Sequence, residues 1–110
     1  MSVKRLAVIG AGTMGRGIIE TAAVRGLRVD AYDVSEEARQ KAAALIQNSI
    51  EKGIRSGKVS GEPSEHLARI VWHNDLRPAV VDADFVVEAV PEQEELKLRM
   101  MAELDQQTRA

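Results

Sequence analysis

The chain has 110 residues, of which 45% are hydrophobic and 29% charged, as in a single globular domain rather than a disordered or fibrous protein. Its formal net charge of -2 provides no basic field for a nucleic-acid backbone. The absence of cysteine excludes disulfides and thiolate metal ligands, and the two histidines are too few for a metal cage. No apolar run approaches the roughly 20 residues of a membrane span. We therefore expect a cytoplasmic protein that binds no nucleic acid, membrane or metal.

The first part of the chain predicts a strand, a helix and a second strand. The continuous apolar run of residues 6–9 indicates a strand over residues 3–9 that is buried on both faces. A glycine cluster follows, and apolar residues then recur at helical spacing until Gly26, which suits a left-handed helix end. Residues 27–33 predict the second strand, which ends in an aspartate.

The middle of the chain predicts a long helix and a third strand. Ser35 suits the N-cap of this helix, along which apolar residues between positions 38 and 54 form one stripe. After a glycine-containing loop, the sequence favours a short helix over residues 64–69 and a strand over residues 70–72. The segment 75–81 remains ambiguous between element types, although Pro78 would be tolerated in a first helical turn.

The last part predicts a fourth strand and a final helix. Residues 84–89 are apolar in their middle, and Leu96, Met100 and Leu104 recur as on one face of a helix. Strands that alternate with helices predict an α/β fold, a doubly wound parallel sheet with right-handed crossovers. In the strand order 3-2-1-4 the fourth strand is an edge, which we expect to pair with another chain.

The run Gly10-Ala11-Gly12-Thr13-Met14-Gly15 fits the pattern G-x-G-x-x-G. Its first glycine allows a tight turn, its second lets a pyrophosphate approach the backbone, and its third lets the helix lie close to the sheet. The amides of the first helical turn then point at the anion, supported by the helix dipole. The pattern alone also fits a turn that serves packing, but its place between strand and helix favours a Rossmann-type dinucleotide site.

Asp33 lies at the end of the second strand, where its carboxylate can accept hydrogen bonds from an adenosine ribose. The same charge would repel a 2′-phosphate, and Val34 and Ser35 follow rather than an arginine. The expected cofactor is therefore NAD rather than NADP. The alternative role for Asp33 is an ordinary helix cap.

Residues after the fourth strand should face the nicotinamide end of a bound dinucleotide, because ligands of doubly wound sheets lie at the carboxyl ends of the strands. Small Ala89 and Val90 would let the cofactor lie against the backbone. Glu92 and Lys97 could reach ribose hydroxyls or an acyl substrate. A simpler interpretation is also open, in which the acids favour a helix N-terminus and the lysine is exposed.

Three segments together resemble the N-terminal domain of the L-3-hydroxyacyl-CoA dehydrogenases, and most of all the 3-hydroxybutyryl-CoA dehydrogenases. They are VIGAGTMGRGI at residues 8–18, Tyr32-Asp33, and residues 84–92 with Lys97. The resemblance covers nearly the whole chain. It implies an NAD-binding Rossmann domain over residues 1–110, an acyl-CoA substrate, and an intact protein of fatty acid metabolism that forms homo-oligomers.

The resemblance also implies roles for single residues. The loop from Gly10 to Gly15 would cradle the pyrophosphate, Asp33 would bind the adenosine ribose, and Glu92 and Lys97 match an acid and a lysine on the nicotinamide side.

Ser49 lies where this family has a serine that contacts coenzyme A. The matching basic position falls near Ser56, where the chain departs from the pattern and Arg55 or Lys58 could substitute. The alternative for Ser49 is a solvent-facing helix residue.

Members of the family continue into a helical domain for substrate binding and dimerisation, which also carries the general base, a histidine. On this comparison the chain is a truncated piece, ending after the fourth strand and its helix. It would hold the cofactor, contain no catalytic residue and be inactive alone. We expect His66 and His73 to be structural.

The leading hypothesis is therefore the NAD-binding part of an oxidoreductase that oxidises the 3-hydroxyl of a 3-hydroxyacyl-CoA by hydride transfer to NAD. Three alternatives stay open. The chain could be a dinucleotide-sensing or binding module without catalysis, a structural domain without a cofactor, or part of a related NAD-dependent hydroxy-acid dehydrogenase.

Overall fold

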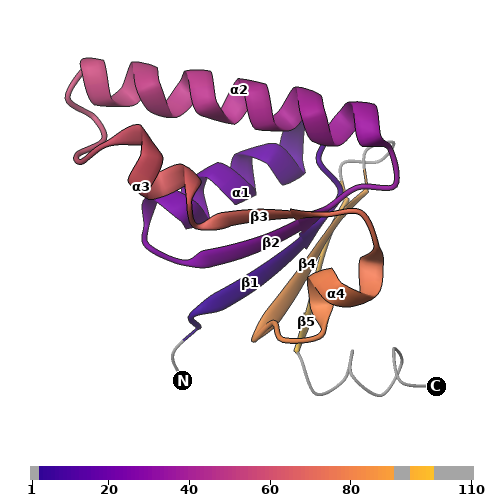
Figure 1. Cartoon of the computed structure of the whole chain (residues 1–110). Helices are drawn as coiled ribbons and strands as arrows, with labels where there is room; N and C mark the ends of the chain where they lie inside the picture. Colours follow the sequence, from indigo (N-terminus) through magenta and orange to yellow (C-terminus); the bar gives the residue numbers. More distant parts are fainter. Residues whose placement is uncertain (1–2, 91–94, 101–110) are drawn as a thin grey trace.

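The computed structural model describes residues 3–90 and 95–100 of the chain. The first half contains β1 (Arg5–Ile9), α1 (Thr13–Val24), β2 (Arg28–Tyr32) and α2 (Glu36–Arg55). The second half contains α3 (Pro63–Leu67), β3 (Ile70–His73), α4 (Leu76–Val80), β4 (Phe85–Val90) and β5 (Glu95–Met100). The predicted alternation of strands and helices is confirmed as far as β4 (Figure 1).

The strands form one sheet in the order β3-β2-β1-β4-β5. β1 pairs in parallel with both β2 and β4, and β2 pairs in parallel with β3. The predicted doubly wound order 3-2-1-4 is therefore confirmed. Helices α1, α2 and α3 lie on one face of the sheet, and α4 lies on the other (Figure 1).

The expected final helix is wrong for residues 95–100, which form β5. This strand runs antiparallel to β4, from Glu95 opposite Val90 to Met100 opposite Phe85. The spacing of Leu96 and Met100 fits a helical face, but it also fits the two-residue period of a strand. Apolar and charged residues alternate strictly from residue 95 to 100, which is the strand pattern. Leu104 lies outside the described residues.

β5 also changes the expectation for the fourth strand. β4 is hydrogen-bonded on both sides, to β1 and to β5, so the expectation that it forms an edge is wrong. The edges of the described sheet are β3 and β5. β4 therefore offers no free backbone edge at which another chain could pair.

The main apolar core lies between the sheet and the helices α1 and α2. Its largest members are Val8, Ile19, Val29, Ile46 and Ile50. A smaller cluster on the other face packs Ala7 and Val86 against Ala79, Val80 and Ala83. The ambiguous segment 75–81 forms α4, whose first turn accommodates Pro78 because the N–H groups there lack helical partners.

The turn from β2 to α2 is fixed by Ser35. Its hydroxyl accepts a hydrogen bond from the Ala38 amide at 3.1 Å, which confirms the predicted N-cap. Glu36 and Glu37 complement the positive end of the helix dipole. This cap holds the segment that follows Asp33.

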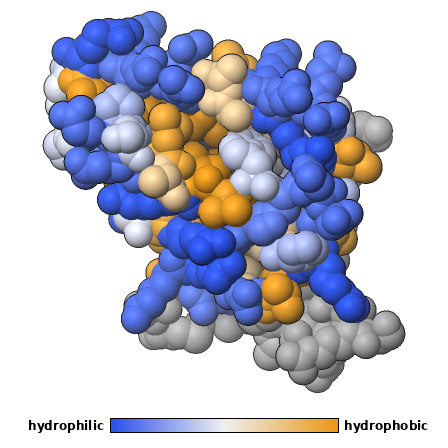
Figure 2. Space-filling view, viewed as in Figure 1, coloured by the Kyte–Doolittle hydropathy of each residue, from blue (hydrophilic) through white to orange (hydrophobic). Residues whose placement is uncertain are grey.

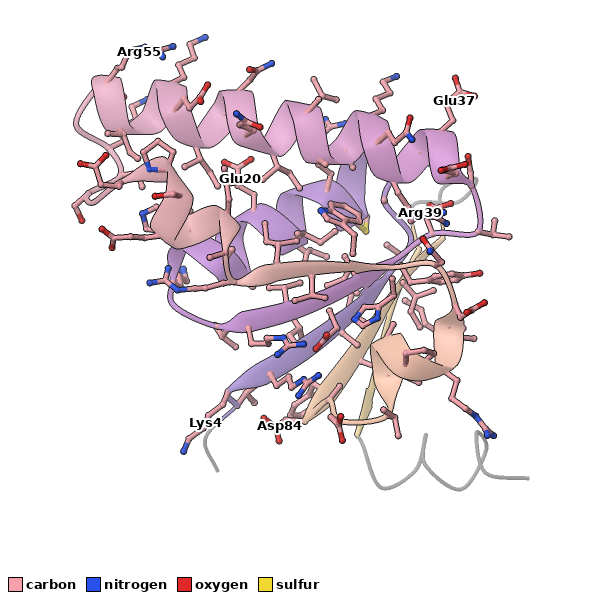
Figure 3. All side chains as sticks on the ribbon, viewed as in Figure 1. Lys4, Glu20, Glu37, Arg39, Arg55 and Asp84 are labelled. Carbon is pink, nitrogen blue, oxygen red and sulfur yellow. The ribbon has the colours of Figure 1, made fainter. Side chains whose placement is uncertain are left out.

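The amino ends of β1 and β4 are joined by Asp84 (Figure 3). Its Oδ2 accepts from the backbone amides of Lys4 and Arg5 at 2.9 and 3.0 Å. These two hydrogen bonds lower the pKa of the Asp84 carboxyl. The contact fixes the register of the two strands, whose carboxyl ends then meet at the opposite edge.

The outer face of α2 is mostly hydrophilic, but apolar surface is visible in the space-filling view between α2 and β3 (Figure 2). A hollow there is lined by Ala43, Ile46, Gln47, Leu67, Ile70 and Trp72. Within the part of the chain that the structure describes, no helix combines the length and apolar character needed to cross a membrane.

Candidate functional site

A hollow of about 260 Å³ lies at the carboxyl ends of β1, β2 and β4. It is lined by Ile9, Gly10, Tyr32, Asp33, Val34, Glu88 and Ala89. Ile9 is in register with Tyr32 on one side and with Glu88 on the other, so β1 and β2 end at the same level and β4 extends beyond it to Val90. In doubly wound sheets this is where ligands bind, next to the point at which the strand order reverses.

The turn from β1 into α1 requires glycine at two positions. Gly10 has a φ of 105°, and a Cβ on it would overlap the carbonyl oxygen of Ala89. A Cβ on Gly15 would overlap the carbonyl oxygen of Gly10. These clashes explain the predicted roles of both glycines, because α1 can start directly against the loop only without side chains there.

The start of α1 is built differently from the start of α2. Its N-cap, Gly12, provides no side-chain hydrogen bond, and its first turn contains no acidic residue. In α2, by contrast, Ser35 caps the helix and two glutamates follow. The chain therefore leaves the first-turn amides of α1 without a side-chain acceptor from the cap, which is the arrangement that binds a phosphate.

Asp33 links the glycine loop to the turn after β2. Its Oδ2 accepts from the Ala11 amide at 2.8 Å, and its Oδ1 accepts from the Ser35 amide at 2.9 Å. Because Ser35 caps α2, the alternative in which Asp33 caps that helix is wrong. A carboxylate has about four acceptor positions, so two hydrogen bonds leave capacity for ribose hydroxyls.

The predicted residues beyond the loop are only partly brought together. Ala89 lines the hollow with Gly10 and Asp33. Thr13 and Met14 line a neighbouring groove along α1, together with Gly17, Ile18, Thr21 and Ala22. Val90 ends β4, and Lys97 is opposite Glu88 in the pairing of β4 with β5. Glu92 lies outside the described residues.

Ser49 is not part of the hollow. It lies in the second half of α2, roughly 20 Å along the helix axis from the first turn. Its hydroxyl donates a hydrogen bond of 2.7 Å to Oε2 of Glu20, on α1 beneath α2 (Figure 3). The expected contact of Ser49 with coenzyme A stays a prediction.

Both histidines have partners within the protein and lie outside the hollow. Nε2 of His66 is 2.7 Å from the carbonyl oxygen of Ser60, and its Nδ1 is 3.0 Å from the guanidinium of Arg69. Nε2 of His73 is 2.8 Å from Oδ1 of Asp30. These contacts support the structural interpretation of both residues.

Asp30 is a fully buried carboxylate on the face of the sheet that carries α4. Arg5 and Arg28 contact it at 2.7 and 3.0 Å, in addition to His73. Burial alone would raise its pKa, but the hydrogen bonds from Arg5, His73 and Arg28 outweigh burial and lower the pKa. This cluster is separate from the hollow and stabilises the sheet.

Sequence reasoning missed Arg39, which lies beside the hollow. Nη1 of Arg39 donates a hydrogen bond of 2.6 Å to the backbone carbonyl of Asp33. The sequence pattern draws attention only to the residues directly after Asp33. Arg39 lies one helical turn after Ser35, and its amide bonds to the Ser35 carbonyl, so helical spacing from the N-cap could have identified it.

Sequence reasoning assigned no individual role to the residues that form the other walls of the hollow: Ile9, Tyr32, Val34 and Glu88. Ile9 and Tyr32 end β1 and β2, Val34 follows β2, and Glu88 lies near the end of β4. Aligning the predicted strand ends would have indicated them.

The chain is similar to known proteins in both sequence and structure. Residues 5–110 match the family described as 3-hydroxyacyl-CoA dehydrogenase, NAD binding domain. The 3-hydroxyadipyl-CoA dehydrogenase of Escherichia coli is 39% identical over 105 residues, which are 94% of this chain and 22% of that protein. The L-carnitine dehydrogenase of Bacillus cereus is 35% identical over 104 residues, which are 94% of this chain and 31% of that protein.

A crystal structure of 3-hydroxybutyryl-CoA dehydrogenase from Escherichia coli matches the fold with a TM-score of 0.75 and 38% identity. The match covers 82% of this chain and 19% of that one. The chain thus spans about a fifth to a third of the length of the relatives described here.

Proposed function

The chain belongs to the family of 3-hydroxyacyl-CoA dehydrogenase NAD binding domains, and from this premise we propose that it binds NAD in the hollow at the carboxyl ends of β1, β2 and β4. NAD is the cofactor of this domain family. The observation that carries the placement is the start of α1, a helix without a side-chain cap that begins at Thr13, shortly after the close-packed Gly10 that lines the hollow.

The glycine loop would hold the pyrophosphate. The amides of Gly12, Thr13 and Met14, at and after the N-cap, can donate to its oxygens. Ala11 supports this arrangement because its own amide is bonded to Asp33. The loop is thereby tied to the residue that would bind the neighbouring sugar.

Asp33 would accept hydrogen bonds from the adenosine ribose, and its charge would disfavour a 2′-phosphate. On the nicotinamide side we propose Ala89, Val90, Glu92 and Lys97. Ser49 is the proposed contact for coenzyme A. Residues 1–110 would then form the NAD-binding domain.

We propose that the intact protein is an oxidoreductase that acts on the 3-hydroxyl of a 3-hydroxyacyl-CoA. The names of the relatives support this class, since they include dehydrogenases of 3-hydroxyadipyl-CoA and 3-hydroxybutyryl-CoA. Bound NAD supplies the acceptor for the hydride. The described residues orient that cofactor at the end of the sheet.

A titration of the purified protein with NADH, followed by cofactor fluorescence, tests the placement. We expect saturable binding that Asp33→Asn weakens about 10- to 100-fold, since a hydrogen bond to a charged acceptor contributes about 1.5–3 kcal/mol. Asp75→Asn removes the same charge at the exposed start of α4 and should change the dissociation constant less than twofold. Absence of saturable binding, or equal effects of the two variants, would refute the placement.

A further inference from the structure

Arg39 brings a positive charge to the turn that carries Asp33. Its guanidinium is bonded to the Asp33 backbone carbonyl, and the contact is partly buried. In the stick view Arg39 lies on the side of α2 that faces the sheet, whereas Glu37 points away from it (Figure 3). The first turn of α2 thus places the guanidinium of Arg39, and not the carboxylate of Glu37, next to the turn that carries Asp33.

The charge of Arg39 is not neutralised by an ion pair with any acid in the part of the chain that the structure describes. The carboxylate of Asp33 is held by the amides of Ala11 and Ser35, while Arg39 is bonded to the backbone carbonyl of the same residue. The Asp33 carboxylate and the Arg39 guanidinium are therefore each held by the backbone of the turn that follows β2.

We propose that Arg39 is a specificity-determining residue for the dinucleotide, and that the Asp33 carboxylate is what keeps a 2′-phosphate out of a site already equipped with a cation. The inference rests on the proposed binding of NAD in this hollow. In Rossmann folds an acid at this position accepts the ribose 2′-hydroxyl, and a nearby arginine accommodates a 2′-phosphate. Both groups are present here.

The charges of Asp33 and Arg39 together decide whether the site accepts or rejects a 2′-phosphate. With the carboxylate in place, a 2′-phosphate meets a like charge at short range and is rejected. Without that charge, the planar guanidinium can bind phosphate oxygens through paired N–H groups while keeping its bond to the carbonyl. Removing one carboxylate should therefore extend the site to NADPH.

The test compares dissociation constants of NADH and NADPH for the natural protein, Asp33→Asn, Arg39→Gln and the double variant. Asn keeps an oxygen that can accept one of the two amides, and Gln keeps an N–H donor for the Asp33 carbonyl. We expect Asp33→Asn to lower the NADPH dissociation constant itself at least tenfold, while it raises that of NADH about 10- to 100-fold. Adding Arg39→Gln should reverse most of the gain for NADPH.

Two further measurements separate a charge effect from a structural one. Binding of NADPH to Asp33→Asn should weaken more steeply with added salt than binding to the double variant, because only the former retains the cation. In the background of Asp33→Asn, Arg39→Lys should keep part of the gain for NADPH. Loss of the gain with lysine and glutamine alike, together with equal salt dependence, would overturn the proposal.

The single variant Arg39→Gln covers the case in which Asp33→Asn fails to fold. It should raise the NADPH dissociation constant at least threefold more than that of NADH, and equal changes for both would contradict the inference. If the natural protein binds no NADH, the proposed function itself fails. If it binds NADH and the NADPH dissociation constant does not respond to the two substitutions as expected, only the specificity inference fails.

Discussion

Asp30 shows how this small domain keeps a carboxylate inside its sheet. Burial favours the neutral acid, yet hydrogen bonds from Arg5, His73 and Arg28 lower its pKa. A group with a lower pKa in the folded than in the unfolded protein stabilises the fold fully above its unfolded pKa of about 4. That contribution is lost as the pH falls further, through the folded pKa.

Asp30→Asn should therefore lower the free energy of unfolding at pH 7 by about 2 kcal/mol. The loss is moderate because the side chains of Arg5 and Arg28 are 29% and 44% exposed and can turn to water. Urea unfolding at pH 7, 5 and 3 should show the difference between variant and natural protein shrinking below pH 4. A difference independent of pH would contradict this account.

Asp33 and Arg39 differ in how far a sequence can reveal them. Asp33 is predictable because an acid directly after the strand that follows a glycine loop can accept hydrogen bonds from a ribose. Its bonds to the amides of Ala11 and Ser35 are not predictable, since they depend on the exact course of two turns. Arg39 was missed because its contact is with a backbone carbonyl, so only its helical spacing from the Ser35 N-cap, and no pairing of residue types, could have indicated it.

At the level of the element, the start of α1 depends on the close approach of Gly15 to the carbonyl oxygen of Gly10, which only glycine permits. Gly15→Ala places a Cβ on the carbonyl oxygen of Gly10, so the helix must move away from the loop. We expect this variant to lower the free energy of unfolding by about 3 kcal/mol. It should also weaken NADH binding, because the first-turn amides shift with the helix.

Gly17→Ala is the matched control in the same helix. A Cβ at Gly17 meets no atom within 4 Å. The substitution should therefore raise the stability by about 0.5–1 kcal/mol, the usual gain from alanine in a helix. Thermal unfolding followed by circular dichroism distinguishes the two variants, and a Gly15→Ala protein as stable as the natural one would refute the close-packing argument.

The segment 95–100 shows the limit of periodicity over a short stretch. A spacing of four is shared by helices and strands, so Leu96 and Met100 alone do not decide between them. The intervening residues alternate as in a strand, and the partner edge offered by β4 determines the outcome. Pairing with a distant strand is a tertiary effect that local propensity does not contain.

For the whole molecule, the strand order and the hollow follow from a few strong patterns. Buried apolar strands, a glycine turn and intervening helices predict a parallel sheet whose carboxyl ends meet at one edge, and the structure has that arrangement. The walls of the hollow were harder to predict because they depend on register. Ile9, Tyr32 and Glu88 become neighbours only through the register of β1 with β2 and with β4.

The central claim is that a dinucleotide lies across the start of α1 and the end of β2. Chemical-shift mapping of the backbone amides during titration with NADH tests it directly. We predict the largest changes at residues 10–15 and at Asp33 and Val34, with small changes in α3 and in the hollow between α2 and β3. Saturation with unchanged amides in the glycine loop, or with changes centred on Trp72, would contradict the account.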